Sequence, residues 1–218
     1  MLRYPCLVLD HDDTLVQSTP TINYPSFVES LRILRPGTEI ALEEFLRYCY
    51  APGFFELCTD ILGFSDEELN FQIAHWRRYS RSHRPLPYPG LDEILHQQRK
   101  LGGLICVVSH SSDENIRRDY RESFGLMPDL IYSSDLPAEQ RKPSPYALRD
   151  IMERCGLTPN QLLMVDDLRP GLEMAQACGV PFAAAGWSHT VPELAEDLRR
   201  SSDFYLESVD GLRHLIFD

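Results

Sequence analysis

Short apolar runs recur along the chain, and they show little of the alternation between polar and apolar residues that a half-exposed strand has. They lie at residues 6–10, 104–109, 130–134, 162–166, 181–186 and 203–207. Uniformly apolar runs of this length are typical of parallel strands that are buried on both faces. The pattern therefore predicts the strands of one buried parallel sheet.

Segments with helical periodicity separate most of these runs. They span residues 90–102, 112–125, 144–156, 170–179 and 191–200. Strands that alternate with helices of about 10 to 15 residues indicate βαβ units with right-handed crossovers. We therefore predict an α/β fold with a Rossmann-like parallel sheet flanked by helices.

Residues 19–87 interrupt this alternation, because they contain several amphipathic helical stretches and no convincing buried strand. The clearest stretch covers residues 64–84, where Ser65 and Glu68 match a capping box and apolar residues follow at helical spacing. A proline-rich connector then returns the chain to the βαβ pattern. The interruption predicts a helical insertion after the first strand.

This insertion suggests a division into two domains. A chain of 218 residues is longer than a typical single domain and shorter than two full ones, which favours one core domain with a sizeable insertion. We predict a core domain of residues 1–15 and 88–218 and a small α-helical cap domain of residues 16–87.

Charge and composition limit the partners. The formal net charge of -12 argues against nucleic acid, because phosphate backbones are bound by clusters of Lys and Arg. The sequence contains no apolar stretch of the roughly 18 residues that span a membrane and no signal-peptide pattern at its start. The six cysteines lack the CxxC spacing of a metal or redox site, so we expect reduced core residues. We expect a cytoplasmic monomer or homodimer with no membrane partner.

Acidic residues gather where two of the predicted strands end. The first run leads into Asp10 and Asp12, and the fourth ends at Asp166, which Asp167 follows. The functional crevice of an open parallel sheet lies beyond the carboxyl ends of its strands. Carboxylates that meet there raise one another's pKa unless a cation lies between them, and Mg²⁺ prefers such oxygen ligands. The sequence therefore predicts a Mg²⁺ site at this edge.

Two further residues complete a recognisable set. Ser109 ends the second run, and Lys142, one of only two lysines in the chain, precedes Pro143 in the loop after the third. In their order along the chain, these motifs resemble those of the haloacid dehalogenase superfamily: Asp10, Asp12 and Thr14, then Ser109, then Lys142, then Asp166 and Asp167. The resemblance covers almost the whole chain. It is closest in type to the phosphatase branch with a helical cap after the first motif, as in phosphoglycolate phosphatases and beta-phosphoglucomutases.

The resemblance implies a Mg²⁺-dependent phosphatase that hydrolyses a small phosphorylated metabolite through an aspartyl-phosphate intermediate. Asp10 would be the nucleophile, and Asp12 would protonate the leaving oxygen and then activate water. The phosphate oxygens would be bound by Thr14, Ser109, His110 and Lys142. The metal would be bound by Asp10, Asp12, Asp166 and Asp167.

Two features narrow the reaction within the superfamily. Dehalogenating members lack the second acid of the first motif, since a halide leaves without a proton, so Asp12 favours phosphoryl chemistry. Phosphonate-cleaving members need a lysine in the cap, and the sequence has none between Thr19 and Pro87. The resemblance therefore points to phosphate esters.

One position departs from the family pattern. The fourth motif commonly has another aspartate four residues after the metal-binding one, and Gly171 stands at that position. Asp166 could compensate, or Glu173 could reach the metal through water. This departure motivates an alternative, a catalytically weakened protein that only binds a phosphorylated ligand.

The two residues beside the catalytic aspartates have simpler expected roles. His11 points away from them if the strand alternation continues, so we expect a structural role. Asp13 is expected to support the turn after the strand, because short acidic side chains hydrogen-bond their own backbone there.

The predicted cap carries aromatic and basic residues that could close over the leaving group of an anionic or polar substrate. The candidates are Phe54, Phe55, Arg77 and Arg78. The competing interpretation is an ordinary helical core with a solvated basic face.

Two other functions are compatible with these motifs. A phosphomutase would move the phosphoryl group between hydroxyls of one sugar, and the motifs do not separate it from a phosphatase. A receiver-like signalling domain also combines acids, a hydroxyl residue and a lysine around Mg²⁺. In receiver domains, however, the lysine comes last, whereas here Lys142 precedes Asp166.

Overall fold

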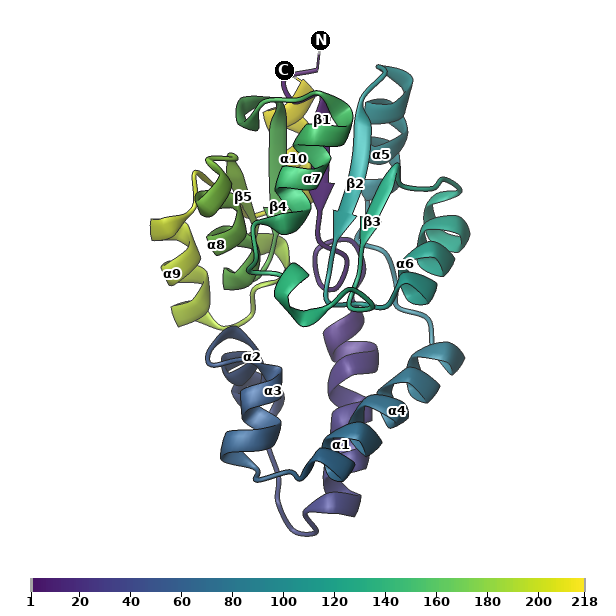
Figure 1. The fold of residues 1–218 in the computed structure, drawn as a ribbon, viewed down its shortest axis with the longest axis vertical. Helices are drawn as coiled ribbons and strands as arrows, with labels where there is room; N and C mark the ends of the chain where they lie inside the picture. The colour runs from purple at the N-terminus through teal and green to yellow at the C-terminus, as the bar shows by residue number, and fades with distance from the viewer. Residues whose placement is uncertain (1, 218) are drawn as a thin grey trace.

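The computed structural model describes residues 2–217, and within this range six strands form a single parallel sheet (Figure 1). The strand order is β3-β2-β1-β4-β5-β6, and every pairing is parallel. The strands are β1 (Cys6–Leu9), β2 (Leu104–Val108), β3 (Leu130–Tyr132), β4 (Leu162–Asp166), β5 (Phe182–Ala185) and β6 (Phe204–Leu206). The predicted α/β fold is confirmed.

Helices cover both faces of the sheet, because successive strand residues point to opposite sides. Leu7 and Leu9 face a cluster with α5 (Leu91–Lys100), α6 (Asp113–Asp119) and α10 (Val209–Phe217). Cys6 and Val8 face a second cluster with α7 (Tyr146–Cys155), α8 (Arg169–Cys178) and α9 (Pro192–Ser201). The uniformly apolar strands are therefore buried between two helical layers, as predicted.

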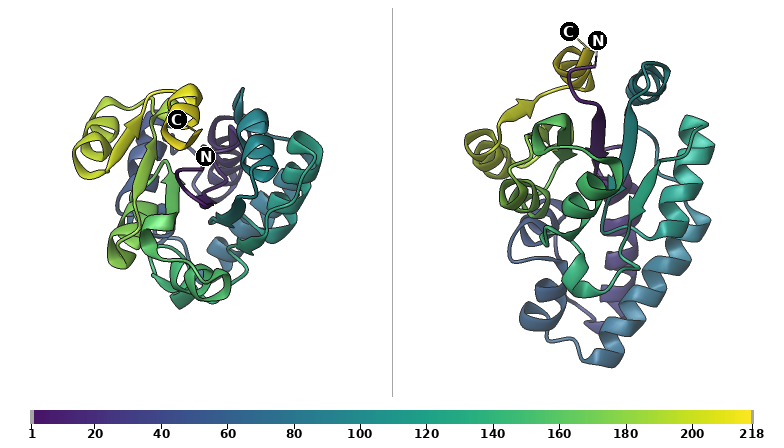
Figure 2. Two further views of the ribbon diagram at one scale, coloured as in Figure 1. Left: turned by 90° about the horizontal axis from the view of Figure 1, so that it is seen from above. Right: turned by 45° about the horizontal axis from the view of Figure 1, so that its top comes forward.

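The chain returns to its starting point. The first and last described segments lie side by side (Figure 2), and the backbone N–H of Arg3 donates to the carbonyl of Ile216 at 3.2 Å. This contact involves the last helix, α10, which the sequence analysis did not predict. Its apolar Leu212 and Ile216 lie one turn apart, but Gly211 and the short length weaken the helical pattern.

The residues between β1 and α5 form helices that lie beyond the ends of the strands, on the side to which the strand arrows point (Figure 1). We call residues 19–82 the helical insertion. Its helices are α1 (Tyr24–Leu34), α2 (Leu42–Tyr50), α3 (Phe54–Glu56) and α4 (Asp66–Ser82), with π-helical turns at Thr19–Asn23 and Leu57–Ile61. It has a hydrophobic cluster of its own that includes Phe27, Leu31, Phe45, Leu57 and Phe64.

The start of α4 is the capping box that the sequence predicts. The backbone N–H of Glu68 donates to the Ser65 hydroxyl at 3.3 Å, and the N–H of Ser65 donates to the Glu68 carboxylate at 2.9 Å. Two N–H groups at the helix start are thereby satisfied. None of the helices among residues 2–217 has the length and apolar character to cross a membrane.

Candidate active site

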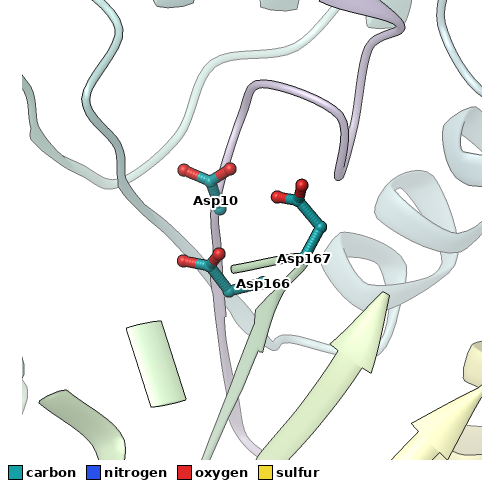
Figure 3. Close-up of side chains that lie close together, drawn as sticks. All are labelled: Asp10, Asp166 and Asp167. Carbon is teal, nitrogen blue, oxygen red and sulfur yellow. The ribbon is translucent and has the colours of Figure 1, made fainter. Parts of the chain in front are cut away.

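Three carboxylates meet where two central strands end. Asp10 follows β1, Asp166 ends the neighbouring strand β4, and Asp167 follows it. The backbone N–H of Asp10 donates to the carbonyl of Val165 at 2.9 Å, which fixes the two strand ends side by side. One oxygen from each carboxylate lies within 4.8 Å of the others, and Figure 3 shows Asp166 and Asp167 beside Asp10.

Lys142 lies between two of these carboxylates. Its Nζ is 2.8 Å from Oδ1 of Asp10 and 2.5 Å from Oδ2 of Asp166, and all three side chains are buried. Burial opposes the charge on the amine, but the two carboxylates outweigh it and hold the pKa of Lys142 above its usual value. The ammonium therefore stays charged and orients Asp10.

One ammonium does not balance three carboxylates. Burial, followed by the charges of Asp166 and Asp10, raises the pKa of Asp167 well above its usual value. Burial, only partly offset by Lys142, raises the pKa of Asp166 to about 7. A divalent cation beside these oxygens would relieve the repulsion, and an all-carboxylate donor set suits Mg²⁺. The residues present therefore fit the metal that the family resemblance implies.

The three carboxylates differ in how many of their oxygens already have donors. Both oxygens of Asp166 accept hydrogen bonds, Oδ2 from Lys142 and Oδ1 from the backbone N–H of Leu168 at 2.8 Å. Asp167 accepts from the Thr14 hydroxyl through Oδ1 at 3.3 Å. Asp10 and Asp167 consequently retain more capacity for a metal ion than Asp166 does.

Gly171 lies against Asp166. A Cβ atom on this glycine would be 2.2 Å from Oδ2 of Asp166, so any side chain here would force Asp166 to shift. Glu173, the other residue considered as a substitute, is about half exposed and accepts from Nε of Arg169 at 3.0 Å on the surface of α8. The absence of an aspartate at position 171 therefore leaves room for the carboxylate that holds Lys142.

The remaining residues proposed to bind phosphate surround this centre. Ser109 follows β2, is buried, and its Oγ accepts from the backbone N–H of Ser111 at 3.1 Å. Nε2 of His110 is 3.1 Å from the carbonyl of Lys142. Desolvation and the Lys142 ammonium lower the pKa of His110 to about 4, so its imidazole is neutral near pH 7. The structure thus brings the residues of the four motifs to one end of the sheet.

Asp12 faces the helical insertion. It lines a chamber whose other walls include Ser18, Trp76, Ser80, Asn115 and Arg118. The chamber volume is about 10 Å³, enough for a single water molecule. Burial, reinforced by Asp10, raises the pKa of Asp12, although His11 opposes the shift. In this arrangement the chamber is too small to hold a substrate.

His11 and Asp13 have structural contacts of the expected kind. His11 is buried, and its Nε2 lies 3.0 Å from Oδ2 of Asp119 on α6. Asp13 has a positive φ of 56°, and its Oδ1 accepts from the backbone N–H of Thr19 at 3.1 Å. These contacts anchor the loop that carries Asp10 and Asp12.

The structure brings one of the four candidate substrate residues of the insertion to a pocket between insertion and core. Arg77 lines an outer pocket of about 160 Å³, with Nη2 3.7 Å from Oδ1 of Asp135. Arg78 instead donates to Nδ1 of His75 at 3.0 Å. Phe54 packs against aromatic rings of the insertion, and Phe55 is 49% exposed. Neither phenylalanine lines these pockets.

Sequence reasoning missed the residues that line the chamber opposite Asp12. Ser18 belongs to the segment entering the insertion, and Asn115 and Arg118 belong to α6. The polar segment directly after Ser109 could have indicated Asn115 and Arg118, because the loops that follow the strand ends form the crevice of such a fold.

Comparison with known proteins identifies the family. The family model for haloacid dehalogenase-like hydrolases matches residues 4–179. A phosphoglycolate phosphatase of Pseudomonas putida is 31% identical over 206 residues, which cover 88% of this chain and 74% of the relative. A phosphoglycolate phosphatase of Pseudomonas savastanoi pv. phaseolicola is 28% identical over 210 residues, covering 89% of this chain and 75% of the relative.

Solved structures share the fold over nearly the whole chain. A predicted phosphoglycolate phosphatase from Haemophilus somnus superposes with a TM-score of 0.77 at 16% identity, covering 99% of each chain. CbbY from Rhodobacter sphaeroides, in complex with xylulose-(1,5)bisphosphate, superposes with a TM-score of 0.74 at 19% identity and covers 97% of this chain and 99% of that one. Because the sequence identities are low, these superpositions show a shared fold and do not show a shared activity.

Proposed function

The chain belongs to the haloacid dehalogenase-like hydrolases, and from that premise we propose that it is a Mg²⁺-dependent phosphatase acting on a small phosphorylated metabolite through an aspartyl-phosphate intermediate. The observation that carries this proposal is the placement of Asp10, which contacts Lys142 at 2.8 Å and lies within 4.8 Å of Asp166 and Asp167. The names of the relatives make 2-phosphoglycolate the first substrate to test.

In the first step, a carboxylate oxygen of Asp10 attacks the phosphorus of the ester. An O–P bond forms to Asp10, the bond from phosphorus to the leaving oxygen breaks, and that oxygen takes a proton from Asp12. The raised pKa of Asp12 suits this role, because a general acid must hold its proton near working pH. The product is an aspartyl-phosphate and a free alcohol.

In the second step, Asp12 acts as the base. Its carboxylate takes a proton from a water molecule, whose oxygen attacks the phosphorus and displaces the Asp10 carboxylate. Inorganic phosphate leaves, and Asp10 and the protonated Asp12 are restored. The small chamber beside Asp12 supports this division of labour, since it limits the water that can reach the intermediate.

The phosphoryl group needs positive charge and hydrogen-bond donors during both steps. We assign these roles to Lys142, Ser109, Thr14 and His110, and Asp166 acts through Lys142 as a positioning residue. Mg²⁺ held by Asp10, Asp167 and the backbone carbonyl of Asp12, with Asp166 adjacent, would supply charge that offsets the transferring phosphoryl group.

We further propose that residues 16–87 act as a cap domain on a core of residues 1–15 and 88–218. The separate hydrophobic cluster of the helical insertion supports a unit that can move as one body. The chamber between the insertion and Asp12 supports closure over the leaving group.

A panel of phosphate monoesters that includes 2-phosphoglycolate, assayed with and without Mg²⁺, tests the proposal. Mg²⁺-dependent release of phosphate supports it. Isomerisation of a sugar phosphate in the presence of a bisphosphate primer, without net release, would favour the phosphomutase alternative. Tight ligand binding without turnover would favour the weakened binding protein, although the packing of Asp166 against Gly171 argues for an ordered site. Family membership leaves the receiver-domain alternative without support.

A further inference from the structure

Buried polar side chains connect the helical insertion to the loop that carries the proposed nucleophile and general acid. We call this loop, residues 10–16, the acidic loop. The connection runs from the Ser80 carbonyl through Arg118 and Asp119 to His11. Burying charged groups costs stability unless they are well paired, and none of these side chains takes part in the proposed chemical steps. The connection therefore needs another role.

Arg118 joins the end of α4, in the helical insertion, to α6 of the core. Its Nη1 donates to the Ser80 carbonyl at 2.8 Å and to Oδ1 of Asn115 at 3.0 Å, and the side chain is 12% exposed. Ser80 lies in the last turn of α4, where carbonyls have no N–H group of the same helix to accept from and carry the negative end of the helix dipole. In Figure 1, α6 accordingly lies beside the end of α4 that is nearer to the sheet. A helix of the core thus supplies a charged donor to the end of a helix of the insertion.

Asp119 bridges Arg118 and His11 with both of its carboxylate oxygens. Oδ1 accepts from Nε of Arg118 at 2.7 Å, and Oδ2 lies 3.0 Å from Nε2 of His11. Burial opposes the charge on Asp119, but the hydrogen bonds from His11 and Arg118 outweigh it and hold the pKa of Asp119 below its usual value. Because the carboxylate is ionised and can only accept, Nε2 of His11 carries a proton and donates to it.

His11 fixes the acidic loop through both its side chain and its backbone. Its side chain is 1% exposed and bonded to Asp119, as described above. Its backbone carbonyl accepts from the N–H groups of Leu15 and Val16, at 3.0 and 3.2 Å, and so closes the loop. His11 lies between the two catalytic aspartates in sequence, so a shift of its backbone moves both of them.

We propose that His11, Asp119 and Arg118 are positioning residues that couple the place of the helical insertion to the alignment of the acidic loop. While the end of α4 contacts Arg118, Asp119 is held against His11 and the loop is fixed. When that contact is lost, the two charged side chains gain freedom, and the loop gains freedom with them. The attacking carboxylate and the proton donor are then fully aligned only while the insertion lies over them. This inference rests on the proposed phosphatase function and adds how that site is assembled.

Amide hydrogen exchange tests the coupling without any substrate. Arg118→Gln should raise exchange about 5-fold or more both in the last turn of α4 and in the acidic loop. His11→Leu removes the donor to Asp119 and should raise exchange in the same two segments, because coupling between two sites is reciprocal. Arg117→Gln is the matched control, since its side chain is half exposed and pairs with Asp113 at 2.6 Å, and it should change neither segment. Faster exchange only at the mutated end of the connection would overturn the inference.

Kinetics separate positioning from a general loss of structure. His11→Leu should lower kcat for the best ester of the substrate panel about 10-fold and leave KM within about twofold, because the reacting groups are misaligned after the ester has bound. His11→Gln should restore most of kcat, since its Nε2 is as many bonds from the backbone as Nε2 of histidine and can still donate to Asp119. Equal losses of kcat in the two variants would overturn the inference.

The two experiments fail independently of each other. If the wild type hydrolyses no ester, the proposed function is contradicted, and the exchange experiment still decides whether the insertion and the acidic loop are coupled. If His11→Leu does not fold, exchange in the acidic loop of Arg118→Gln decides the point alone. Exchange there equal to that of the wild type would then overturn the inference.

Discussion

A Cβ atom at Gly171 would lie 2.2 Å from Oδ2 of Asp166, the oxygen that binds the Lys142 ammonium. The space in front of Gly171 is therefore filled by a carboxylate from the neighbouring strand end. Lys142 in turn contacts Asp10 at 2.8 Å. The glycine that departs from the family pattern thus permits the arrangement that orients the proposed nucleophile.

Gly171→Ala tests this relationship. The added methyl group must displace Asp166, and a misplaced Lys142 should lower kcat about 10- to 100-fold. Gly211→Ala is the matched control, because Gly211 lies in α10 and the nearest atom to a Cβ there would be in the Leu206 side chain, at an ordinary contact distance of 3.7 Å. Steady-state kinetics of both variants decide the point. Wild-type kcat in Gly171→Ala, or a gain of activity in Gly171→Asp, would refute the account of this position.

Ion pairs connect the helical insertion to the core, and they all have the same orientation of charge. Arginines come from the insertion or the connector after it, and acids come from the core, in the pairs Arg47–Glu193, Arg77–Asp135, Arg81–Glu114 and Arg84–Glu122. Exposed pairs of this kind are screened by salt. We therefore expect the closed insertion to become less favourable as ionic strength rises.

The prediction is that KM increases as NaCl rises from about 0.05 M to about 0.5 M, and that Arg84→Gln reduces the size of this increase. Arg154→Gln is the control, since Arg154 pairs with Asp150 within α7 at 3.0 Å and does not touch the boundary. An identical salt dependence in wild type and Arg84→Gln would show that this ion pair has no part in closure.

Inside the helical insertion, Arg35 and Glu68 form a bidentate ion pair with N–O distances of 2.7 and 2.9 Å. Arg35, followed by the backbone N–H of Ser65, lowers the pKa of Glu68 from 4.5 to about 2. Because the pKa of Glu68 is lower in the folded state than in the unfolded state, its contribution to stability is fully present at pH values above the unfolded-state pKa. That contribution is lost as the folded-state carboxylate becomes protonated. The stability that Glu68 provides should therefore disappear as pH falls from about 4.5 towards 2.

Glu68→Gln should remove this part of the acid sensitivity. Thermal unfolding between pH 6 and pH 2 should show a smaller loss of Tm in the variant than in wild type, and Glu67→Gln at the neighbouring position should follow wild type. Parallel curves for wild type and Glu68→Gln would contradict the assignment.

The sequence predicted the sheet and the grouping of the acidic residues at its edge because both depend on local patterns. Strands buried on both faces are uniformly apolar, and the residues that follow their carboxyl ends must share one edge. The sequence alone therefore predicted that Asp10 and Asp166 lie close together. Helix α10 was not predicted because it is short and Gly211 weakens its helical periodicity.

The chamber could not be predicted in the same way, since tertiary packing forms it. Arg117 and Arg118 are identical residue types in sequence, and only the orientation of α6 places one in solvent and the other against the insertion. Likewise, the importance of Gly171 depends on where Asp166 points, which no spacing rule reveals. The candidates Phe54 and Arg78 were chosen by residue type, and the structure packs them within the insertion.

The central claim is that Asp10 is the nucleophile of a Mg²⁺-dependent phosphatase. Its most direct test measures phosphate release from the best ester of the substrate panel, with Mg²⁺, by wild type and by Asp10→Asn. The variant keeps the size of the side chain but loses the attacking carboxylate. The account predicts turnover by wild type and no measurable turnover by Asp10→Asn. Retained turnover in the variant would contradict it.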